Sequence, residues 1–184
     1  VARIIVDPDT AANTVPLRTV RYYLNVINLG NATDSILLNK RNTRPGWSAL
    51  IYDSAGSNQI TFVKLSANGG RVKIRVDITP PDTGQAPAGS KDTTFIDGLS
   101  TNVPGIRDSS SLTTTITLVV GLIVRPDQSG QTLPGRPINY PLWAINRGNG
   151  PDTVQLVRYH TRPLWTAQLY DSTGTNIINR LYLR

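Results

Sequence analysis

His160 is the first residue to consider for metal or acid–base chemistry, because it is the one histidine of a chain that has no cysteine. It lies in the segment Arg158-Tyr159-His160-Thr161-Arg162, among polar and cationic neighbours that offer it no second ligand and no carboxylate. The chain has no GxSxG, HExxH, Walker or GxGxxG motif. The sequence therefore predicts a solvated loop at His160, no cofactor and no enzymatic activity.

Aspartates near turns are the other groups that could hold a metal ion. Asp7, Asp9 and Asp127 flank prolines, and Asp53 and Asp171 precede turns that contain glycine. Calcium needs six to eight oxygen ligands converging on one point, and the chain has no DxDxDG spacing. We therefore predict that these carboxylates cap turns and that the chain holds no metal.

An internal duplication organises the chain and shows which elements must position any site. Residues 1–66 and 119–184 align without a gap, at a shift of 118 positions, and share 28 identical residues. The repeated motifs are Asn28-Leu29-Gly30-Asn31 with Asn146-Arg147-Gly148-Asn149, Asp34 with Asp152, Thr43-Arg44-Pro45 with Thr161-Arg162-Pro163, and Trp47 with Trp165. A period this long indicates tandem domains rather than a solenoid.

The second copy is shorter than the first. The first domain is predicted to span residues 1–117, and the second to span 118–184 and to stop at the equivalent of residue 66. It therefore lacks counterparts of Arg71–Ile78 and Asp92–Ile116. Either the chain was cut from a longer array, or something else completes the second domain.

Both copies are predicted to consist of β-strands. Apolar and polar residues alternate in Val20–Val26 and in Arg71–Ile78, which is the period of a strand with one wet face. Further strands are predicted at Arg3–Val6, Asp34–Leu38, Trp47–Ile51, Gln59–Leu65, Asp92–Ile96 and Leu112–Ile116, with turn residues between them and no helix. The predicted fold class is all-β, with tandem Ig-like antiparallel Greek-key β-sandwiches of which the second is incomplete.

The repeated Asn-x-Gly-Asn segment is predicted to form a tight bend. Glycine accepts a positive φ, and asparagine side chains hydrogen-bond to neighbouring backbone. The bend would join a strand that ends near Asn28 to one that begins near Asp34.

Aromatic residues are predicted to serve two purposes. Trp47 and Trp165 are expected to fill the space between two sheets, each burying on the order of 200 Å². Trp143 replaces Asn25 and is expected on the opposite strand face. Together with Tyr159, Tyr182 and Tyr23 it is a candidate contact for a partner or a glycan.

The repeat resembles a known family. The motif Asn28-Leu29-Gly30-Asn31 with Asp34, the pair Gly46-Trp47, and the Pro-rich stretches Pro80-Pro81-Asp82 and Ala86–Gly89 are similar to the NEW3/DUF11-type extracellular immunoglobulin-like repeats of prokaryotic surface proteins. The resemblance covers the first copy fully and residues 119–184 of the second, which departs at Leu164 in place of glycine. It implies a secreted or cell-surface location and the role of a spacer, docking module or filament subunit.

The net charge of +7 would favour binding to the phosphates of nucleic acid, so this class of partner has to be considered. The cations are spread along the chain, with short groups at Lys40-Arg41 with Arg44 and at Arg71, Lys73 and Arg75, and no RNP-like aromatic pattern accompanies them. We expect attraction to cell-wall polysaccharide or to an acidic neighbouring subunit rather than to nucleic acid. The longest apolar run, Leu118–Val124, is too short to span a membrane.

The function predicted from the sequence is that of a non-enzymatic structural protein of a microbial cell surface, such as an S-layer, filament or stalk segment. An unfinished second sandwich would expose Trp165, Ala167 and Leu169, so strands from a neighbouring molecule would complete it and could give polymers. The partners would be other copies or neighbouring domains of a longer surface protein. The alternative is a carbohydrate- or partner-binding accessory module of a secreted glycosidase or adhesin.

Overall fold

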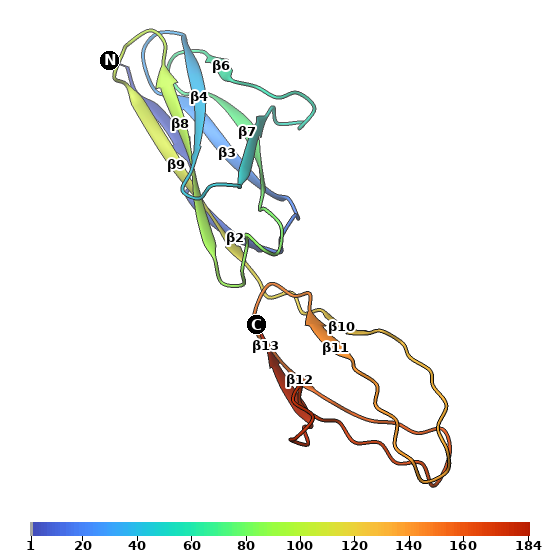
Figure 1. The fold of residues 1–184 in the computed structure, drawn as a ribbon. Helices are drawn as coiled ribbons and strands as arrows, with labels where there is room; N and C mark the ends of the chain where they lie inside the picture. Colours follow the sequence, from blue (N-terminus) through green and yellow to red (C-terminus); the bar gives the residue numbers. More distant parts are fainter. Residues whose placement is uncertain (1) are drawn as a thin grey trace. The chain divides into compact units, whose positions relative to one another are not determined.

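The computed structural model describes residues 2–184 and forms two compact units that divide between Leu118 and Val119 (Figure 1). The predicted division, after Thr117, lies one residue away. Val1 lies outside the described residues. Within residues 2–184 every regular element is a strand, which confirms the all-β fold class.

The first unit is a sandwich of two sheets. The first sheet has the order β1 (Ile4–Asp7), β3 (Val20–Asn28), β7 (Gly70–Thr79), β5 (Ser48–Tyr52). The second has the order β2 (Thr10–Thr14), β9 (Arg107–Ile116), β8 (Lys91–Ser100), β4 (Asp34–Asn42), β6 (Phe62–Leu65). The chain crosses from one sheet to the other between β3 and β4 and again between β4 and β5, as in a Greek-key sandwich.

One strand pair departs from the predicted antiparallel arrangement. β2 pairs with β9 in parallel, whereas the other strand pairs of the sandwich are antiparallel. The chain leaves the first sheet after Asp7 and reaches the edge of the second sheet at Thr10 without reversing. The sequence did not predict β2, because Thr10–Thr14 has no apolar alternation.

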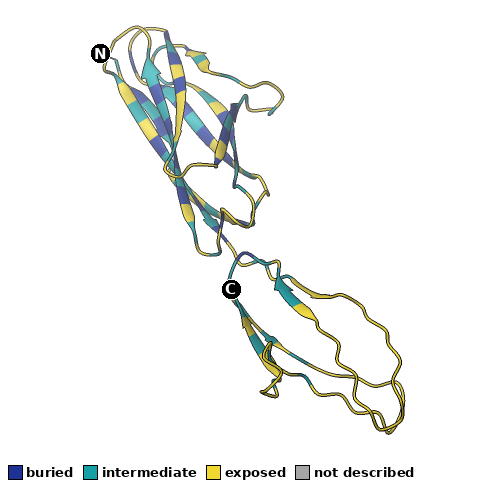
Figure 2. Ribbon diagram, in the orientation of Figure 1, coloured by how far each residue is buried: buried dark blue, intermediate teal, exposed yellow. Residues whose placement is uncertain are grey.

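The core lies between the two sheets of the first unit (Figure 2). Alternation places Tyr22, Leu24 and Val26 of β3 inside, and β7 lies beside β3 with the pairs Tyr22–Val76 and Leu24–Ile74 in register. The buried apolar residues are Ile4, Val6, Tyr22, Leu24, Val26, Ile36, Leu38, Trp47, Ala49, Ile51, Leu65, Ile74, Val76, Ile78, Ala86, Ile96, Leu112 and Ile116. All of them belong to the first unit.

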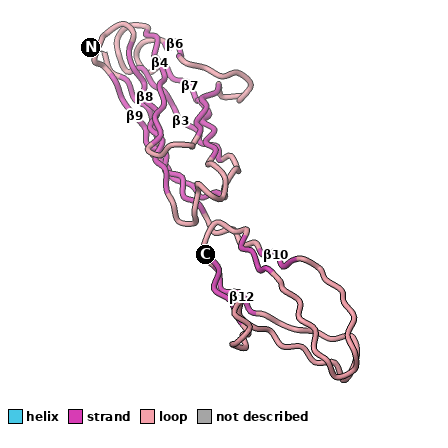
Figure 3. Tube along the Cα trace, in the orientation of Figure 1, coloured by secondary structure: helices cyan, strands magenta, loops and turns pink. Residues whose placement is uncertain are grey.

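The second unit has two separate two-stranded sheets joined by long loops (Figure 3). β10 (Leu122–Arg125) pairs with β11 (Trp143–Asn146), and β12 (Asp152–Gln155) pairs with β13 (Arg180–Leu183). At the shift of 118 positions these are the counterparts of β1, the end of β3, the start of β4, and β6. The pairing is conserved too, since β1 pairs with Asn25–Asn28 and β6 pairs with Asp34–Leu37.

The segments of the second unit that do not form strands are those whose partner strands have no counterpart in residues 119–184. In the first unit Val20–Leu24 pairs with β7, Leu38–Asn42 with β8, β5 with β7, and β2 with β9. The second unit has no counterpart of β7, β8 or β9. The segment equivalent to β2 therefore remains without strand pairing, and the segment equivalent to β5 keeps a single bridge between Tyr170 and Ile177. β11 and β12 are shortened to the residues that still have a neighbouring strand.

Candidate functional site

Asn28 ties the end of β3 to two other segments of the first unit. Its side-chain Oδ1 accepts a hydrogen bond from the Gly30 amide at 2.9 Å. Its Nδ2 donates to the carbonyl oxygens of Ala32 at 2.9 Å, Leu65 at 3.3 Å and Ser66 at 3.1 Å. Asn28 is buried, and the bend between β3 and β4 is the one that the motif predicts.

The second unit repeats the bend with Asn146, Gly148 and Asn149. Asn146 Oδ1 accepts from the Gly148 amide at 2.8 Å, and Asn146 Nδ2 donates to the Gly150 carbonyl at 2.8 Å. Asn149 Oδ1 accepts from the amide of Val119 at 2.7 Å, which fixes the first residue of this unit. Asn31, the counterpart of Asn149, is exposed at the same bend of the first unit.

The reason predicted for the glycine is wrong at Gly148. Its φ is not positive, and a Cβ there would lie 2.4 Å from the Val119 carbonyl oxygen. Glycine is needed at this position because another backbone segment passes too close for a side chain.

Asp34 and Asp152 show what the shorter copy has lost. Asp34 is buried and accepts from Ser100 Oγ at 2.5 Å and from the Asn102 amide at 3.3 Å, so it connects the start of β4 to the loop between β8 and β9. Asp152 Oδ1 instead accepts from the amide of its neighbour Thr153 at 2.7 Å.

The two equivalent tryptophans have opposite environments. Trp47 is 8% exposed and packs in the core, with Ala49 and Ile51 inside on the same face of β5, as expected. Trp165 is 63% exposed, so the prediction that it fills an intersheet space does not hold in this structure. The strand that would hold it in place has no partner, because the counterpart of β7 is absent.

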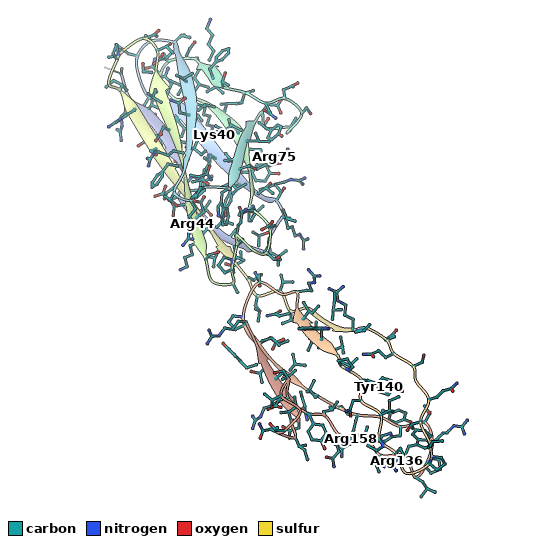
Figure 4. All side chains as sticks on the ribbon, viewed as in Figure 1. Lys40, Arg44, Arg75, Arg136, Tyr140 and Arg158 are labelled. Atoms are coloured by element: carbon teal, nitrogen blue, oxygen red, sulfur yellow. The ribbon has the colours of Figure 1, made fainter. Side chains whose placement is uncertain are left out.

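Core-type residues of the second unit are not buried. Eleven core positions of the first unit fall within residues 1–66, and their counterparts are all apolar: Leu122, Val124, Tyr140, Leu142, Ala144, Val154, Leu156, Trp165, Ala167, Leu169 and Leu183. None of the eleven is buried, although the structure describes all of residues 119–184. Figure 4 shows Tyr140 standing on one of the long loops, whereas its counterpart Tyr22 is buried. We call these eleven residues the open core.

Asp53 and Asp171 close the same turn in both units. Asp53 Oδ1 accepts from the Ser57 amide at 2.9 Å and Oδ2 from Asn58 Nδ2 at 2.8 Å. Asp171 Oδ1 accepts from Thr173 Oγ1 at 2.6 Å and Oδ2 from Asn176 Nδ2 at 2.7 Å. The Asn58 side chain chiefly lowers the pKa of Asp53, and Thr173 and Asn176 hold the pKa of Asp171 well below its usual range. These contacts agree with the predicted turn capping.

The aromatic residues predicted to contact a partner or a glycan are exposed, but they lie on separate elements. Trp143 lies on β11, Tyr182 on β13 of the other sheet, and Tyr159 in the loop after β12, with exposed fractions of 70%, 62% and 91%. Trp165, the counterpart of the core residue Trp47, is exposed in the same unit. The exposure of an aromatic side chain therefore does not by itself indicate a glycan-binding site. Tyr23 of the first unit is half-exposed and has the Lys73 ammonium 5.3 Å from its ring centroid.

Several cations of the first unit contact the protein itself. Arg41 lies 4.4 Å from the Phe95 ring centroid, and Arg44 Nε donates to the Lys91 carbonyl at 2.7 Å. Lys40 Nζ donates to the Ala49 carbonyl. Arg75 forms an ion pair with Asp77 at 2.9 Å. Figure 4 shows Lys40, Arg44 and Arg75 on the first unit.

Asp92 is a buried, hydrogen-bonded residue that sequence reasoning missed. It is fully buried near the start of β8 and accepts hydrogen bonds from Asn42, Thr43 and Arg44 at the end of β4. The repetition of Thr43-Arg44-Pro45 as Thr161-Arg162-Pro163 is the signal that could have drawn attention to these donors. His160 takes the place of Asn42 and lies exposed in a loop.

The described residues offer neither a metal-ligand cluster nor a membrane-spanning helix. In residues 2–184 no three His, Cys, Asp or Glu side chains lie together as metal ligands. The same residues contain no helix of the length and apolarity that a bilayer crossing requires.

Comparison with known proteins adds likenesses of structure only. No family model matches the chain, and no curated protein matches it. Similar solved structures include the ASH/PapD-like domain 7 of human CEP192, at 13% identity and a TM-score of 0.41 over 62% of this chain and 84% of that one. The class 5 fimbriae chaperone CfaA is 11% identical, with a TM-score of 0.43 over 98% of this chain and 82% of that one. The secreted serine protease VesC from Vibrio cholerae is 13% identical, with a TM-score of 0.42 over 67% of this chain and 24% of the protease.

The geometry therefore offers a surface for adding strands. Residues 138–142 and 157–160, next to β11 and β12, lie outside the paired strands, and the open core adds apolar side chains that are not buried. A polypeptide in extended conformation satisfies both at once, through main-chain hydrogen bonds and alternate side chains. The assignment of the repeat to the NEW3/DUF11 type stays a prediction.

Proposed function

We propose that this chain is a non-enzymatic structural module of a microbial cell surface, such as an S-layer, filament or stalk segment, whose second sandwich is completed by strands from outside residues 1–184. The observation that carries the proposal is the open core, in which eleven core-type residues lack cover. The surface setting rests on the resemblance of the repeat motif to extracellular Ig-like repeats.

The first unit supports the proposal because it shows what a completing segment has to provide. There β7 lies between β3 and β5, and β8 and β9 extend the second sheet beside β4. These strands contribute Ile74, Val76 and Ile78 to one side of the core and Ile96, Leu112 and Ile116 to the other. The second unit shares 28 of 66 residues with the half that these strands cover.

Copies of residues 1–184 cannot complete one another. Each copy has two halves that need cover, residues 1–66 and 119–184, and one set of covering strands, β7, β8 and β9. Any exchange of these strands among identical copies leaves as many halves open as there are chains. The donor strands therefore belong to a segment other than these residues.

The test adds a covering segment to the full chain. A polypeptide copied from residues 67–117, carried on a soluble fusion partner, is mixed with the 184-residue chain. We expect a one-to-one complex by light scattering. In a chain with Trp47→Phe and Trp143→Phe, in which Trp165 is the one tryptophan left, we expect a blue shift of the emission as the open core is covered. A matched control segment has lysine in place of Ile74 and Ile96, which face the core, and we expect it not to bind.

A second arm distinguishes the source of the strands. The same segment is joined after Arg184, where its high effective concentration favours folding. Completion in the joined chain without any binding of the separate segment would contradict a donor molecule and assign the strands to the same chain. An open core in both arms would contradict strand completion altogether.

A further inference from the structure

The first unit contains a carboxylate that is held at a fixed place by the end of β4. Asp92 has no exposed surface, and its Oδ1 accepts from Thr43 Oγ1 at 2.9 Å and from the Arg44 amide at 2.8 Å. Its Oδ2 accepts from Asn42 Nδ2 at 2.9 Å and from Thr94 Oγ1 at 3.0 Å. Three of the four donors belong to residues 42–44, so they come from the half that is repeated.

Backbone contacts place β8 in register at the same point. The Thr93 amide donates to Thr43 Oγ1 at 2.9 Å, and the Thr43 amide donates to the Thr93 carbonyl at 3.1 Å. Arg44 Nε donates to the carbonyl of Lys91, the residue before the aspartate, at 2.7 Å. The carboxylate and the strand that bears it are thus recognised together.

The second unit retains these donors without the carboxylate. Thr161 and Arg162 repeat Thr43 and Arg44, and His160, whose ring N–H can donate, stands in place of Asn42. All three are exposed in the loop that follows β12. Residues 119–184 have no counterpart of Asp92, because the sequence that would contain it is the missing part of the repeat.

We infer that His160, Thr161 and Arg162 form a carboxylate-binding site for an aspartate or glutamate near the start of the completing strand, and that this contact sets the strand's register. The inference rests on the proposed strand completion and names its recognition chemistry. Burying a carboxylate without donors is costly, so a segment with the acidic residue one position out of register is disfavoured. Shifting a strand by one residue would also turn its apolar side chains away from the open core.

A double-mutant cycle tests the inference with the full chain and the separate segment copied from residues 67–117. Thr161→Val removes the hydroxyl donor with little change of shape, and Asp92→Ala in the segment removes the carboxylate. We expect each change to weaken binding at least about tenfold, as for a hydrogen bond to a charged group. We expect the two changes together to weaken binding by less than the product of their separate factors, because both remove the hydrogen bond between the Thr161 hydroxyl and the carboxylate.

Matched variants separate this contact from general effects on the loop. Thr153→Val changes an exposed threonine on β12, away from residues 160–162, and should leave affinity unchanged. His160→Asn restores the residue of the first unit and should preserve binding, whereas His160→Ala should weaken it.

The outcomes distinguish the two proposals. Suppose that Thr161→Val lowers the affinity for the segment with Asp92 and for the Asp92→Ala segment by equal factors. That result overturns the carboxylate site and leaves strand completion standing. Failure of every segment to cover Trp165, even when joined after Arg184, overturns both.

Discussion

At the scale of residues, Asn28 is the most connected side chain of the repeated motif. We expect Asn28→Ala to lower the free energy of unfolding of the first unit by about 3 kcal/mol, because it leaves buried backbone groups of the bend without partners. Urea denaturation followed by circular dichroism measures the loss. Asn39→Ala, at an exposed position on β4, is the control and should change stability by less than about 0.5 kcal/mol. Equal stability of the two variants would contradict the role given to Asn28.

The turns closed by Asp53 and Asp171 should resist acid. Their hydrogen bonds favour the charged carboxylate, which lowers the pKa of both groups below the usual value of 3.8. Because the pKa is lower in the folded state, the stabilisation is fully present above the unfolded-state pKa. It is lost as the pH falls through the lower, folded-state pKa. NMR titration of the carboxyl carbons should show both groups ionising below the usual range, and Asn58→Ala should raise the pKa of Asp53. Titration of both groups at the usual value would refute the capping contacts.

At the scale of elements, the alternation of apolar and polar residues predicted the strands that have a neighbouring strand on each side, such as β3 and β7. β3 and β7 have long runs in which every second residue is apolar, so their position and inward faces followed from the sequence. β2 did not, because it is a polar edge strand held by pairing with β9. Its existence depends on a partner about a hundred residues away.

In the candidate site, too, the sequence did not predict features that depend on residues far apart in the chain. The duplication identified the motif and the missing segment, but the burial of a tryptophan depends on strands distant in the sequence. Trp165 has the same local sequence pattern as Trp47, with alanine two residues later, yet it is exposed. The contacts of Asp92 join residues 48 to 50 positions apart, and such contacts leave no local pattern to read.

The two tryptophans give a prediction for the strand β5 and its counterpart. Trp47→Ala should lower the free energy of unfolding of the first unit by about 4 kcal/mol, because it leaves a large cavity between the sheets. Trp165→Ala should have no measurable effect on the 184-residue chain, since this side chain is largely exposed. When a covering segment is joined after Arg184, the same substitution should become costly. Calorimetry of the 184-residue chain, its Trp47→Ala and Trp165→Ala variants, and the joined chain with and without Trp165→Ala measures the contrast. A destabilising Trp165→Ala in the 184-residue chain would mean that the open core is already covered.

At the scale of the whole molecule, the chain combines one finished sandwich with half of another. Every buried apolar side chain among residues 2–184 lies in the first unit, and the second unit keeps only strand pairs whose partners both lie within residues 119–184. In the proposed completion, one extended polypeptide would supply both the hydrogen bonds and the apolar contacts that a complete sandwich has.

Amide hydrogen exchange on the full chain, alone and with the covering segment, tests this account most directly. We predict strong protection of β3, β7 and β8 in both samples. In the second unit the chain alone should show at most weak protection, confined to β10–β13 and their immediate neighbours, because residues 138–142, 157–160 and 166–169 lie outside its paired strands. With the covering segment these three stretches should become protected together, since cooperative units of structure open as one. Strong protection of the three stretches in the chain alone, or no gain on adding the segment, would contradict the account.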